Sequence, residues 1–362
     1  MIDLNATENF LFVPHPGKTK GILYVLAFVE KYEKNSFVLL PYQNPQVKNP
    51  VALFYKIEEI INDVDFNLYK KNLRPPVVKF EAVTSKEKYL TTVKQLKHEI
   101  QIGNIYEINY CIRFVSKNTS IDPIRVFLVL NKLAKAPYAC LLKTGSDYVI
   151  CASPELFLKR EQNAISTKPI KGTTRRGKTE DEDLFLKNEL HHNLKERTEN
   201  VMAVDVARND LSHFAKKGTV RVNQLYNIET FETVHQMVST VSCDLKEELL
   251  NEDPPAIFDT IISATFPMAS MTGAPKLRAM KLIDAFEEFE RKSYSGAMGI
   301  IDDKGDFVLS VIIRSIFYND YKKELSFAVG GAITYLSEPE KEYEECLLKA
   351  KALLKALNAS VS

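Results

Sequence analysis

The sequence lacks a charge imbalance, a long apolar run and a leader-like start, and each absence excludes a class of protein. Lys and Arg number 48 against 47 Asp and Glu, so the net charge of +1 creates no long-range field that would attract nucleic acid or an anionic membrane. No 18 consecutive residues are apolar, and the segment from Met1 to Glu8 has no basic region leading into an apolar core. We therefore expect a cytoplasmic globular protein that binds neither nucleic acid nor membranes.

Cysteine pairs and cysteine motifs are also missing. The five cysteines are odd in number, far apart and never arranged as Cys-x-x-Cys, which is typical of buried reduced thiols and not of disulfides or zinc sites. None is flanked by the glycines of a nucleophile elbow, so we expect no glutaminase activity in this chain. These residues are Cys111, Cys140, Cys151, Cys243 and Cys346.

The residues that are present are sufficient for a large core and an α+β fold. Of the 362 residues, 45% are hydrophobic, and short apolar runs punctuated by proline predict a strand-rich N-terminal portion at 1–80, integrated with the rest at 81–362. Helices and strands then come in blocks, which favours α+β over a doubly wound sheet. We expect helical segments at 85–102, 180–214, 254–264, 274–289 and 339–358, and strands at 105–115, 138–143, 148–151, 294–301, 308–318 and 325–333.

The first candidate for chemistry is Lys171, in a loop that follows a β-rich run. It lies beside Gly172 and Thr173, and a lysine in a site that excludes water can lose its proton and act as a nucleophile. Taken alone, these residues fit a solvated lysine in a basic turn better. The rest of the chain has to decide between the two interpretations.

Four glutamates form the second candidate, a site for Mg²⁺. Glu196 and Glu199 are three residues apart on one predicted helix, and Glu342 and Glu345 are three apart on the last one, with Lys349 one turn beyond. Each pair shares a helix face, and carboxylate oxygens suit Mg²⁺. For either pair alone, a solvated helix face is the more common alternative.

Other residues could hold an anionic substrate. Thr272 and Gly273 precede the start of a predicted helix, where backbone N–H groups can face an anion. Arg314 lies in an apolar strand and needs a carboxylate partner, from the substrate or from a structural Asp. Gly331 ends another strand, where a backbone can approach a ligand closely or form a bulge.

Two residues are candidate proton donors. Glu155 lies in an apolar setting that could raise its pKa toward that of a general acid, although an exposed edge glutamate is equally consistent with the pattern. His235 could donate to a leaving group, but a single histidine is more often structural.

Taken together, over about residues 85–358, these segments resemble the chorismate-utilising family of anthranilate, aminodeoxychorismate, isochorismate and salicylate synthases. The resemblance implies a layered α/β/β/α fold with two packed, antiparallel-rich sheets, in which 81–362 is the chorismate-binding catalytic region. The motifs are Ser153–Glu155, Pro169–Thr173, Glu199–Asn200 with Val204–Asp205 and Arg208–Asp210, His235–Thr240, Thr272–Lys276, Tyr294–Gly296, Arg314 and Glu342–Lys349.

The resemblance also implies roles for individual residues. Mg²⁺, held mainly by Glu199 and Glu345, would bind the ring carboxylate of chorismate, while Lys171 attacks C2 and Glu155, assisted by His235, protonates the departing C4 hydroxyl. Ammonia would then add at C4 and expel the lysine. The remaining metal and substrate ligands implied are Glu196, Glu342, Thr272, Gly273, Tyr294, Arg314, Gly331 and Lys349.

Two positions point to one activity within the family. Isochorismate and salicylate synthases carry a lysine where this chain has Glu107, and anthranilate synthases typically carry alanine where it has Lys171. A lysine at the second position is the mark of aminodeoxychorismate synthases, so the resemblance implies that activity, with ammonia supplied by a separate glutamine amidotransferase subunit. Anthranilate synthesis and a non-catalytic chorismate-binding paralogue remain alternatives.

Two departures from the family pattern affect these expectations. Members usually have glutamine at the position of Glu107, and a third glycine is common where this chain has Ala332. Glutamate at position 107 changes the charge near C2. Alanine at position 332 weakens the expected backbone contact at Gly331.

Overall fold

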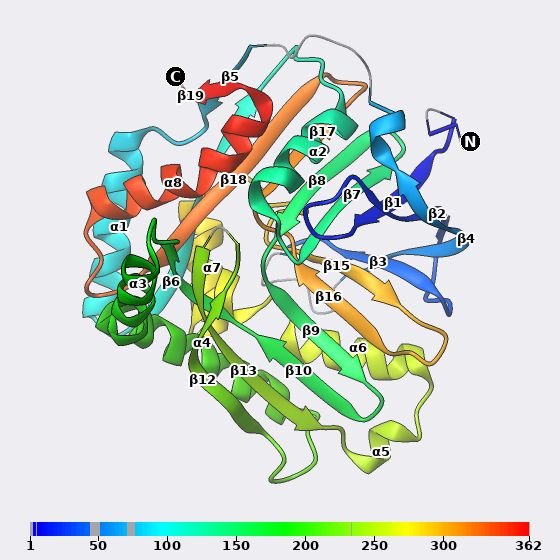
Figure 1. Cartoon of the computed structure of the whole chain (residues 1–362). Coiled ribbons are helices and arrows are strands. Elements are labelled where there is room, and N and C mark those ends of the chain that lie inside the picture. The colour runs from blue at the N-terminus through cyan, green and yellow to red at the C-terminus, as the bar shows by residue number, and fades with distance from the viewer. Residues whose placement is uncertain (1–2, 5, 44–50, 71–76, 233, 362) are drawn as a thin grey trace.

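Antiparallel strands form most of the core of the protein. A computed structural model describes residues 3–4, 6–43, 51–70, 77–232 and 234–361 (Figure 1). The strands are β1 Asn9–Pro14, β2 Lys20–Val29, β3 Ser36–Leu40, β4 Leu53–Asp65, β5 Val78–Ala82, β6 Glu107–Ser116, β7 Tyr138–Thr144, β8 Asp147–Ser153, β9 Leu156–Glu161, β10 Ala164–Lys168, β11 Ile170–Arg175, β12 Arg221–Thr230, β13 Val234–Asp244, β14 Gly273–Ala274, β15 Ala297–Ile301, β16 Phe307–Val311, β17 Ser315–Asn319, β18 Glu324–Ile333 and β19 Ala359–Val361.

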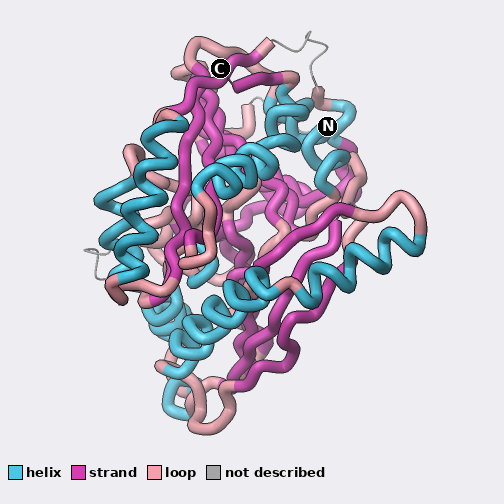
Figure 2. Tube along the Cα trace, turned by 90° about the vertical axis from the view of Figure 1, so that its left-hand side faces the viewer, coloured by secondary structure: helices cyan, strands magenta, loops and turns pink. Residues whose placement is uncertain are grey.

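Helices flank these strands. In the view turned by 90°, helices lie in front of strands that run through the centre of the molecule (Figure 2). The helices are α1 Lys86–Gln101, α2 Pro123–Ala134, α3 Glu180–His192, α4 Leu194–Ser212, α5 Glu247–Leu250, α6 Pro254–Thr265, α7 Lys276–Phe286 and α8 Pro339–Leu357, with 3₁₀ turns at Phe66–Leu68 and Ala269–Met271.

The strand ladder is continuous and folds back on itself. It runs from β12 and β13 through β10, β9, β16, β15, β3, β4, β2, β1, β7, β8, β17 and β18 to β6, and these pairings are antiparallel. Buried side chains of β7 and β8, such as Leu142 and Val149, pack against those of β3 and β15, such as Phe37 and Met298. The expected fold of two packed antiparallel layers is therefore confirmed.

Helices cover the outer faces of the two layers. On one side, α1 and α8 pack on β6 and β18 through residues such as Tyr89 and Leu353, and α2 packs on β7 and β8 through residues such as Phe127. On the other side, α4 and α6 pack on β9 and β16 through residues such as Leu211 and Phe258. Because each amphipathic helix must bury its apolar face, this arrangement gives the α/β/β/α order of layers.

Three expected elements differ in detail from the observed ones. The segment 308–318 forms two strands and not one, because the backbone turns at Ile312–Arg314, where Arg314 has a φ of 52°. The helical segment 180–214 is two helices, divided at Asn193, whose side chain caps α4 by accepting a hydrogen bond from the Glu196 N–H at 3.1 Å. Lys171 lies on strand β11 and not in a loop.

The cysteines and the helices of the described residues bear on two expectations from the sequence. All five cysteines are free and buried, as predicted. In the part of the chain that the structure describes, none of the helices combines the length and the apolar character needed to cross a bilayer.

Candidate active site

Lys171 is buried and paired with a carboxylate. Its side chain is 7% exposed, and its ammonium group donates a hydrogen bond to Oε1 of Glu107, which is 3% exposed and begins β6. Burial acts to lower the pKa of Lys171, but the charges of Glu107, Glu199 and Glu155 outweigh it and raise the pKa to about 12. The alternative of a solvated lysine in a basic turn is therefore wrong.

Glu155 is also buried, in the connection between β8 and β9. Burial raises the pKa of its carboxyl group to about 7, against the opposing effects of the Ser270 hydroxyl, the Lys171 ammonium and the backbone at Ile170. A carboxyl group with such a pKa can donate a proton near neutral pH. The alternative of an exposed edge glutamate is excluded because the residue is 5% exposed.

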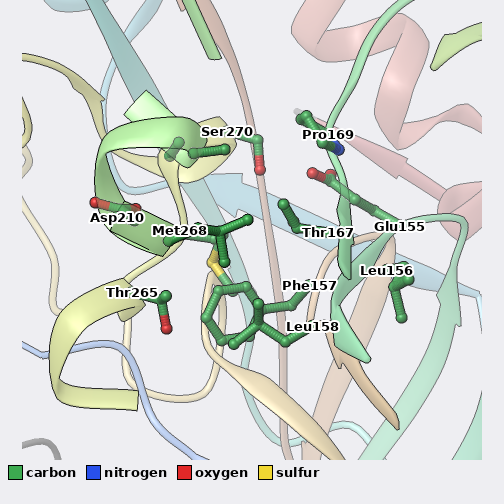
Figure 3. A pocket seen from close by; sticks show the side chains of 13 residues that line it. Glu155, Leu156, Phe157, Leu158, Thr167, Pro169, Asp210, Thr265, Met268 and Ser270 are labelled. Atoms are coloured by element: carbon green, nitrogen blue, oxygen red, sulfur yellow. The ribbon is translucent and has the colours of Figure 1, made fainter. Parts of the chain in front are cut away.

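A small cavity of about 20 Å³ lies beside Glu155. The Glu155 carboxyl group and the Ser270 hydroxyl both point into the space between them, and Thr167 lies close by (Figure 3). Most of its lining is apolar, but a cavity of this size can hold one water molecule where polar groups such as Glu155 and Ser270 face it. Glu155 therefore has room for a single small polar partner.

The four predicted metal ligands come from two helices that meet at the site. Glu199 on α4 is 6% exposed and Glu342 on α8 is 1% exposed, so neither belongs to a solvated helix face. The ammonium of Lys195 lies 2.8 Å from Oε1 of Glu342, 3.7 Å from Oε1 of Glu199 and 4.0 Å from Oε2 of Glu345. Glu196, one turn before Glu199, is half-buried.

Two oxygens of this cluster are buried without a hydrogen-bond partner, Oε1 of Glu199 and Oε2 of Glu342. Burial raises the pKa of Glu199 to about 8, more than Lys171 and Lys195 lower it. Burial also acts to raise the pKa of Glu345, but Lys349, whose Nζ is 2.6 Å from Oε1, holds it below its usual value. The cluster therefore has more buried carboxyl oxygens than its lysines satisfy.

The donor set fits Mg²⁺ in its chemistry. The carboxylates are hard oxygen ligands, and the two unpartnered oxygens are those that a cation would satisfy. In the arrangement described, with Lys195 among the carboxylates, no three acidic, histidine or cysteine side chains of the described residues converge to coordinate one ion. A bound ion would have to replace the ammonium group of Lys195.

Arg314 lies beside this cluster without an ion-pair partner among the described residues. Nη1 donates to the carbonyl oxygen of Lys349 at 3.3 Å, and burial lowers the pKa of the guanidinium. None of the ion pairs among the described residues involves Arg314, so the structural carboxylate partner considered above is not found. Its left-handed backbone aims the side chain at the site from the break between β16 and β17.

Replacing Arg314 with Gln should weaken chorismate binding. A hydrogen-bonded charge pair contributes about 1.5–3 kcal/mol, so we expect KM for chorismate to rise about 10- to 100-fold, with a smaller change in kcat. Steady-state kinetics measures both constants. Arg113→Gln is the matched control, because Arg113 pairs with Glu324 at the other end of β6; an equal rise in both variants would contradict the assignment.

The remaining substrate-binding candidates lie along β6 or next to the carboxylate cluster. A Cβ on Gly273 would lie 2.2 Å from the carbonyl oxygen of Glu107, so only glycine allows β14 to pair with β6 here. Gly331 pairs with Tyr110 of β6, and a Cβ there would be 3.5 Å from Oε2 of Glu342. These contacts place both glycines at the site.

Three other predicted residues also lie near these elements. Tyr294 is 4% exposed, and its hydroxyl is 3.6 Å from Sγ of Cys111 on β6. Thr272 is fully buried and its hydroxyl donates to the Met268 carbonyl oxygen at 3.0 Å. The Lys349 ammonium donates to the Gly330 carbonyl oxygen at 2.8 Å. Their contacts with a substrate stay predictions.

His235 is buried on β13 with both ring nitrogens in use. Nε2 is 3.0 Å from Oδ1 of Asp183 on α3, and Nδ1 is 3.0 Å from the hydroxyl of Thr230. In this arrangement the ring ties α3 to β13. The predicted proton-donor role therefore requires one of these hydrogen bonds to be exchanged for one to the substrate.

Two important residues were not assigned a role from the sequence. Lys195 precedes Glu199 by four residues, and the usual pairing at this helical spacing could have indicated their contact. Glu107 stands in the apolar run from Ile105 to Ile112, where a buried carboxylate needs a cation. Nothing in the sequence indicates that this cation is Lys171.

Comparison with known proteins identifies the family of this chain. A profile of chorismate binding enzymes matches residues 18–355. The chain belongs to the chorismate binding enzyme family. Among curated members of the family, aminodeoxychorismate synthase component 1 of Bacillus subtilis is 36% identical over 281 residues, which cover 78% of this chain and 58% of that protein.

Two further relatives carry two different names. A probable chloroplastic aminodeoxychorismate synthase of Oryza sativa is 38% identical over 77% of this chain and 30% of its own length. Anthranilate synthase component 1 of Aquifex aeolicus is 37% identical over 75% of this chain and 53% of its own. The match thus spans about half or less of these two relatives, and their names do not agree on one reaction.

Solved structures of family members share the fold. Anthranilate synthase component I of Streptococcus pneumoniae superposes with a TM-score of 0.73 at 21% identity, covering 98% of this chain and 93% of that one. The menaquinone-specific isochorismate synthase of Escherichia coli gives 0.75 at 14% identity, covering 98% and 90%. At these identities the likeness establishes the fold alone.

Proposed function

We propose that this chain is an aminodeoxychorismate synthase component I, which converts chorismate and ammonia to 4-amino-4-deoxychorismate and water for 4-aminobenzoate and folate synthesis. The observation that supports this most is a buried lysine, Lys171, whose charge acts on Glu155, a buried carboxyl group with a pKa of about 7. A nucleophile and a proton donor are the two groups that this amination needs.

The substrate is held by cationic and backbone groups. Arg314 and Lys349 bind the carboxylates of chorismate. Among the described residues, Arg314 has no ion-pair partner, and the ion pairs of Lys349 are limited to the one with Glu345. The backbone at Gly331 approaches the ring, since no side chain there stands between it and the carboxylates of Glu342 and Glu345. These contacts orient C2 of the ring toward Lys171.

The chemistry consists of two displacements. The amine of Lys171 forms a bond to C2, the two ring double bonds shift, and the C4–O bond breaks while Glu155 donates the proton that completes water. Ammonia then bonds to C4, the double bonds shift back, and the C2–N bond breaks to release Lys171. No electron is gained or lost overall, and the covalent step divides one difficult displacement into two easier ones.

Mg²⁺ is the proposed cofactor. Glu199 and Glu345 would hold it, with Glu196 and Glu342 behind them, and the bound ion would neutralise and orient the ring carboxylate of chorismate. Lys195 would give up its place between the carboxylates when the ion binds.

Mg²⁺ should stabilise the folded protein without substrate. Because a ligand that binds only the folded state raises the melting temperature, we expect Tm to rise with Mg²⁺ concentration and to saturate. Glu199→Gln removes one charged ligand and should weaken the Mg²⁺ affinity about tenfold or more. Glu344→Gln, on the exposed face of α8, is the control; equal Mg²⁺ affinities in the two variants would contradict the site.

Ammonia is proposed to come from a separate glutamine amidotransferase subunit. This chain has no cysteine with the glycine-flanked setting of a glutaminase nucleophile. We propose that the protein works in the cytoplasm with this subunit as its partner.

Anthranilate synthesis is the second candidate, and one observation favours it. The carboxylates around Lys171 raise its pKa to about 12, and an ammonium group cannot attack C2. If Lys171 keeps its proton, ammonia itself would attack that carbon. The relative from Aquifex aeolicus is as similar as those named aminodeoxychorismate synthase.

Product analysis distinguishes the two reactions. The purified chain is incubated with chorismate, Mg²⁺ and ammonium at high pH, and the products are separated by mass-resolved chromatography. Aminodeoxychorismate without pyruvate supports the proposal, whereas anthranilate with pyruvate supports the second candidate. Chorismate binding without turnover would leave the non-catalytic alternative.

A further inference from the structure

A lysine nucleophile with a pKa of about 12 cannot depend on solvent to remove its proton. At pH 7 nearly all molecules would carry the ammonium form. The structure contains an acceptor already in contact with the proton, because Nζ of Lys171 donates directly to Oε1 of Glu107. Both side chains are almost completely buried, so solvent does not separate them.

We propose that Glu107 is the general base of the reaction, taking the proton of Lys171 inside the buried pair and returning it when the lysine departs. This inference rests on the proposed function, since it concerns how Lys171 becomes the nucleophile. It makes Glu107 a catalytic residue, because its carboxylate exchanges a proton with the reacting nitrogen.

Burial favours such a transfer. Two opposite charges in a site without water cost free energy to desolvate, and moving the proton across their hydrogen bond converts them to a neutral amine and a neutral carboxylic acid. The transfer changes no net charge and needs no proton path to the surface. The pair therefore supplies an amine while its total number of protons stays constant.

Other carboxylates face Lys171, but their positions suit other roles. Glu155 has to carry its own proton to the C4 hydroxyl, and Glu199 belongs to the proposed metal site. Among the hydrogen bonds of the described residues, the one from the Lys171 ammonium goes to Glu107. The charged groups that act on Lys171 or feel its charge are Glu107 on β6, Glu155 before β9, Glu196 and Glu199 on α4, and Glu345 on α8.

The protons balance over the whole cycle. Glu107 takes one proton from the Lys171 ammonium as the C2–N bond forms, and Glu155 gives one to the C4 oxygen as water leaves. When ammonia adds at C4, its surplus proton restores Glu155. The proton on Glu107 then returns to Lys171 as the C2–N bond breaks.

The pH dependence of covalent adduct formation tests the proposal. The chain is mixed with chorismate without ammonium, and the rate at which Lys171 gains the mass of chorismate less one water is measured from pH 5 to 9. With Glu107 as the base, the rate of adduct formation is level below about pH 7. The Lys171–Glu107 pair holds the same number of protons before and after the transfer, so the fraction of reactive amine does not depend on pH. Above pH 7 it falls about tenfold per unit as Glu155 ionises.

Loss of the proton to solvent predicts the opposite shape. The rate would rise about tenfold per pH unit up to about pH 7 and then become level, because ionisation of Glu155 offsets the gain in free amine. This profile in the unmodified protein would overturn the proposal. The measurement needs no variant, so a folding defect cannot obscure it.

Glu107→Gln supplies the contrast. The amide keeps the size and a hydrogen-bonding oxygen but accepts no proton, so Lys171 must lose its proton to solvent. Loss of the Glu107 charge lowers the pKa of Lys171 in this variant, and the rate should rise with pH as long as the pH is below both this pKa and that of Glu155. We expect adduct formation at pH 6 to be at least about tenfold slower than in the unmodified protein. The control is Glu81→Gln, an exposed carboxylate on β5, the strand that pairs with β6.

The outcomes separate this inference from the proposed function. Identical pH profiles in the unmodified protein and Glu107→Gln would show that Glu107 is not the base. No adduct in any of the proteins, with anthranilate as the product, would instead remove the proposed function itself. An adduct that forms with the rising profile leaves Lys171 as the nucleophile and rejects Glu107 alone.

Discussion

Lys171→Ala is expected to abolish aminodeoxychorismate formation. Without the amine no bond can form to C2, and loss of a covalent nucleophile lowers kcat by a factor on the order of a thousand or more. The substrate-binding groups stay in place, so the affinity for chorismate should change little. The rate of aminodeoxychorismate formation and the dissociation constant for chorismate measure the two effects separately.

This variant needs a control for the charge that it leaves behind. Removing the ammonium strands Glu107 as a buried unpaired carboxylate, and breaking a buried pair from one side costs about 3–5 kcal/mol of stability. The double variant Lys171→Ala, Glu107→Gln removes that charge and should recover most of the lost stability without recovering activity. A double variant that makes aminodeoxychorismate at the original rate would exclude a covalent role for Lys171.

Glu155→Gln should produce the second largest loss. A positioned general acid contributes about 10²- to 10⁴-fold, and the amide cannot give a proton to the C4 oxygen. The active form of Glu155 is the protonated one, and its pKa of about 7 means that activity in the unmodified protein falls as the pH rises through that value. The variant should lose both the rate and this pH dependence.

Steady-state kinetics from pH 5 to 9 measures both losses. Glu161→Gln serves as the control, because Glu161 lies at the exposed end of the same strand β9 and pairs with Lys159. A Glu155 variant that keeps a full rate, or that keeps the decline above pH 7, would show that another group donates the proton.

Local signals in the sequence predicted much of the fold. Ser85 before an apolar period of helical spacing marks the start of α1, and its side chain caps the helix by accepting from the Lys88 N–H at 3.2 Å. Residues 325–333 alternate little but are mostly apolar, and they form most of strand β18, which pairs with β6 and β17. Caps and periodicity act over a few residues, so a single sequence reveals them.

Contacts between distant segments could not be derived in this way. Lys171 and Glu107 are 64 residues apart in the sequence, and nothing local to either residue specifies the other. Lys195 and Glu342 are 147 residues apart. The break at Arg314 was also missed, since Ser310–Ile316 reads as one apolar strand and the left-handed turn depends on tertiary packing.

The site residues were grouped only through the family pattern. Glu199 and Glu342 each looked like part of a solvated helix face, and burial in the fold removed that alternative. The pKa of Glu155 depends on burial that a single sequence does not reveal. Their catalytic and metal-binding roles stay predictions until they are measured.

The most direct test of the covalent mechanism is the mass of the protein after incubation with chorismate and Mg²⁺ in the absence of ammonium. We predict a gain equal to chorismate less one water, located by peptide mapping on Lys171 and reversed on addition of ammonium with release of aminodeoxychorismate. An unmodified mass in a preparation that makes aminodeoxychorismate once ammonium is added would contradict the mechanism.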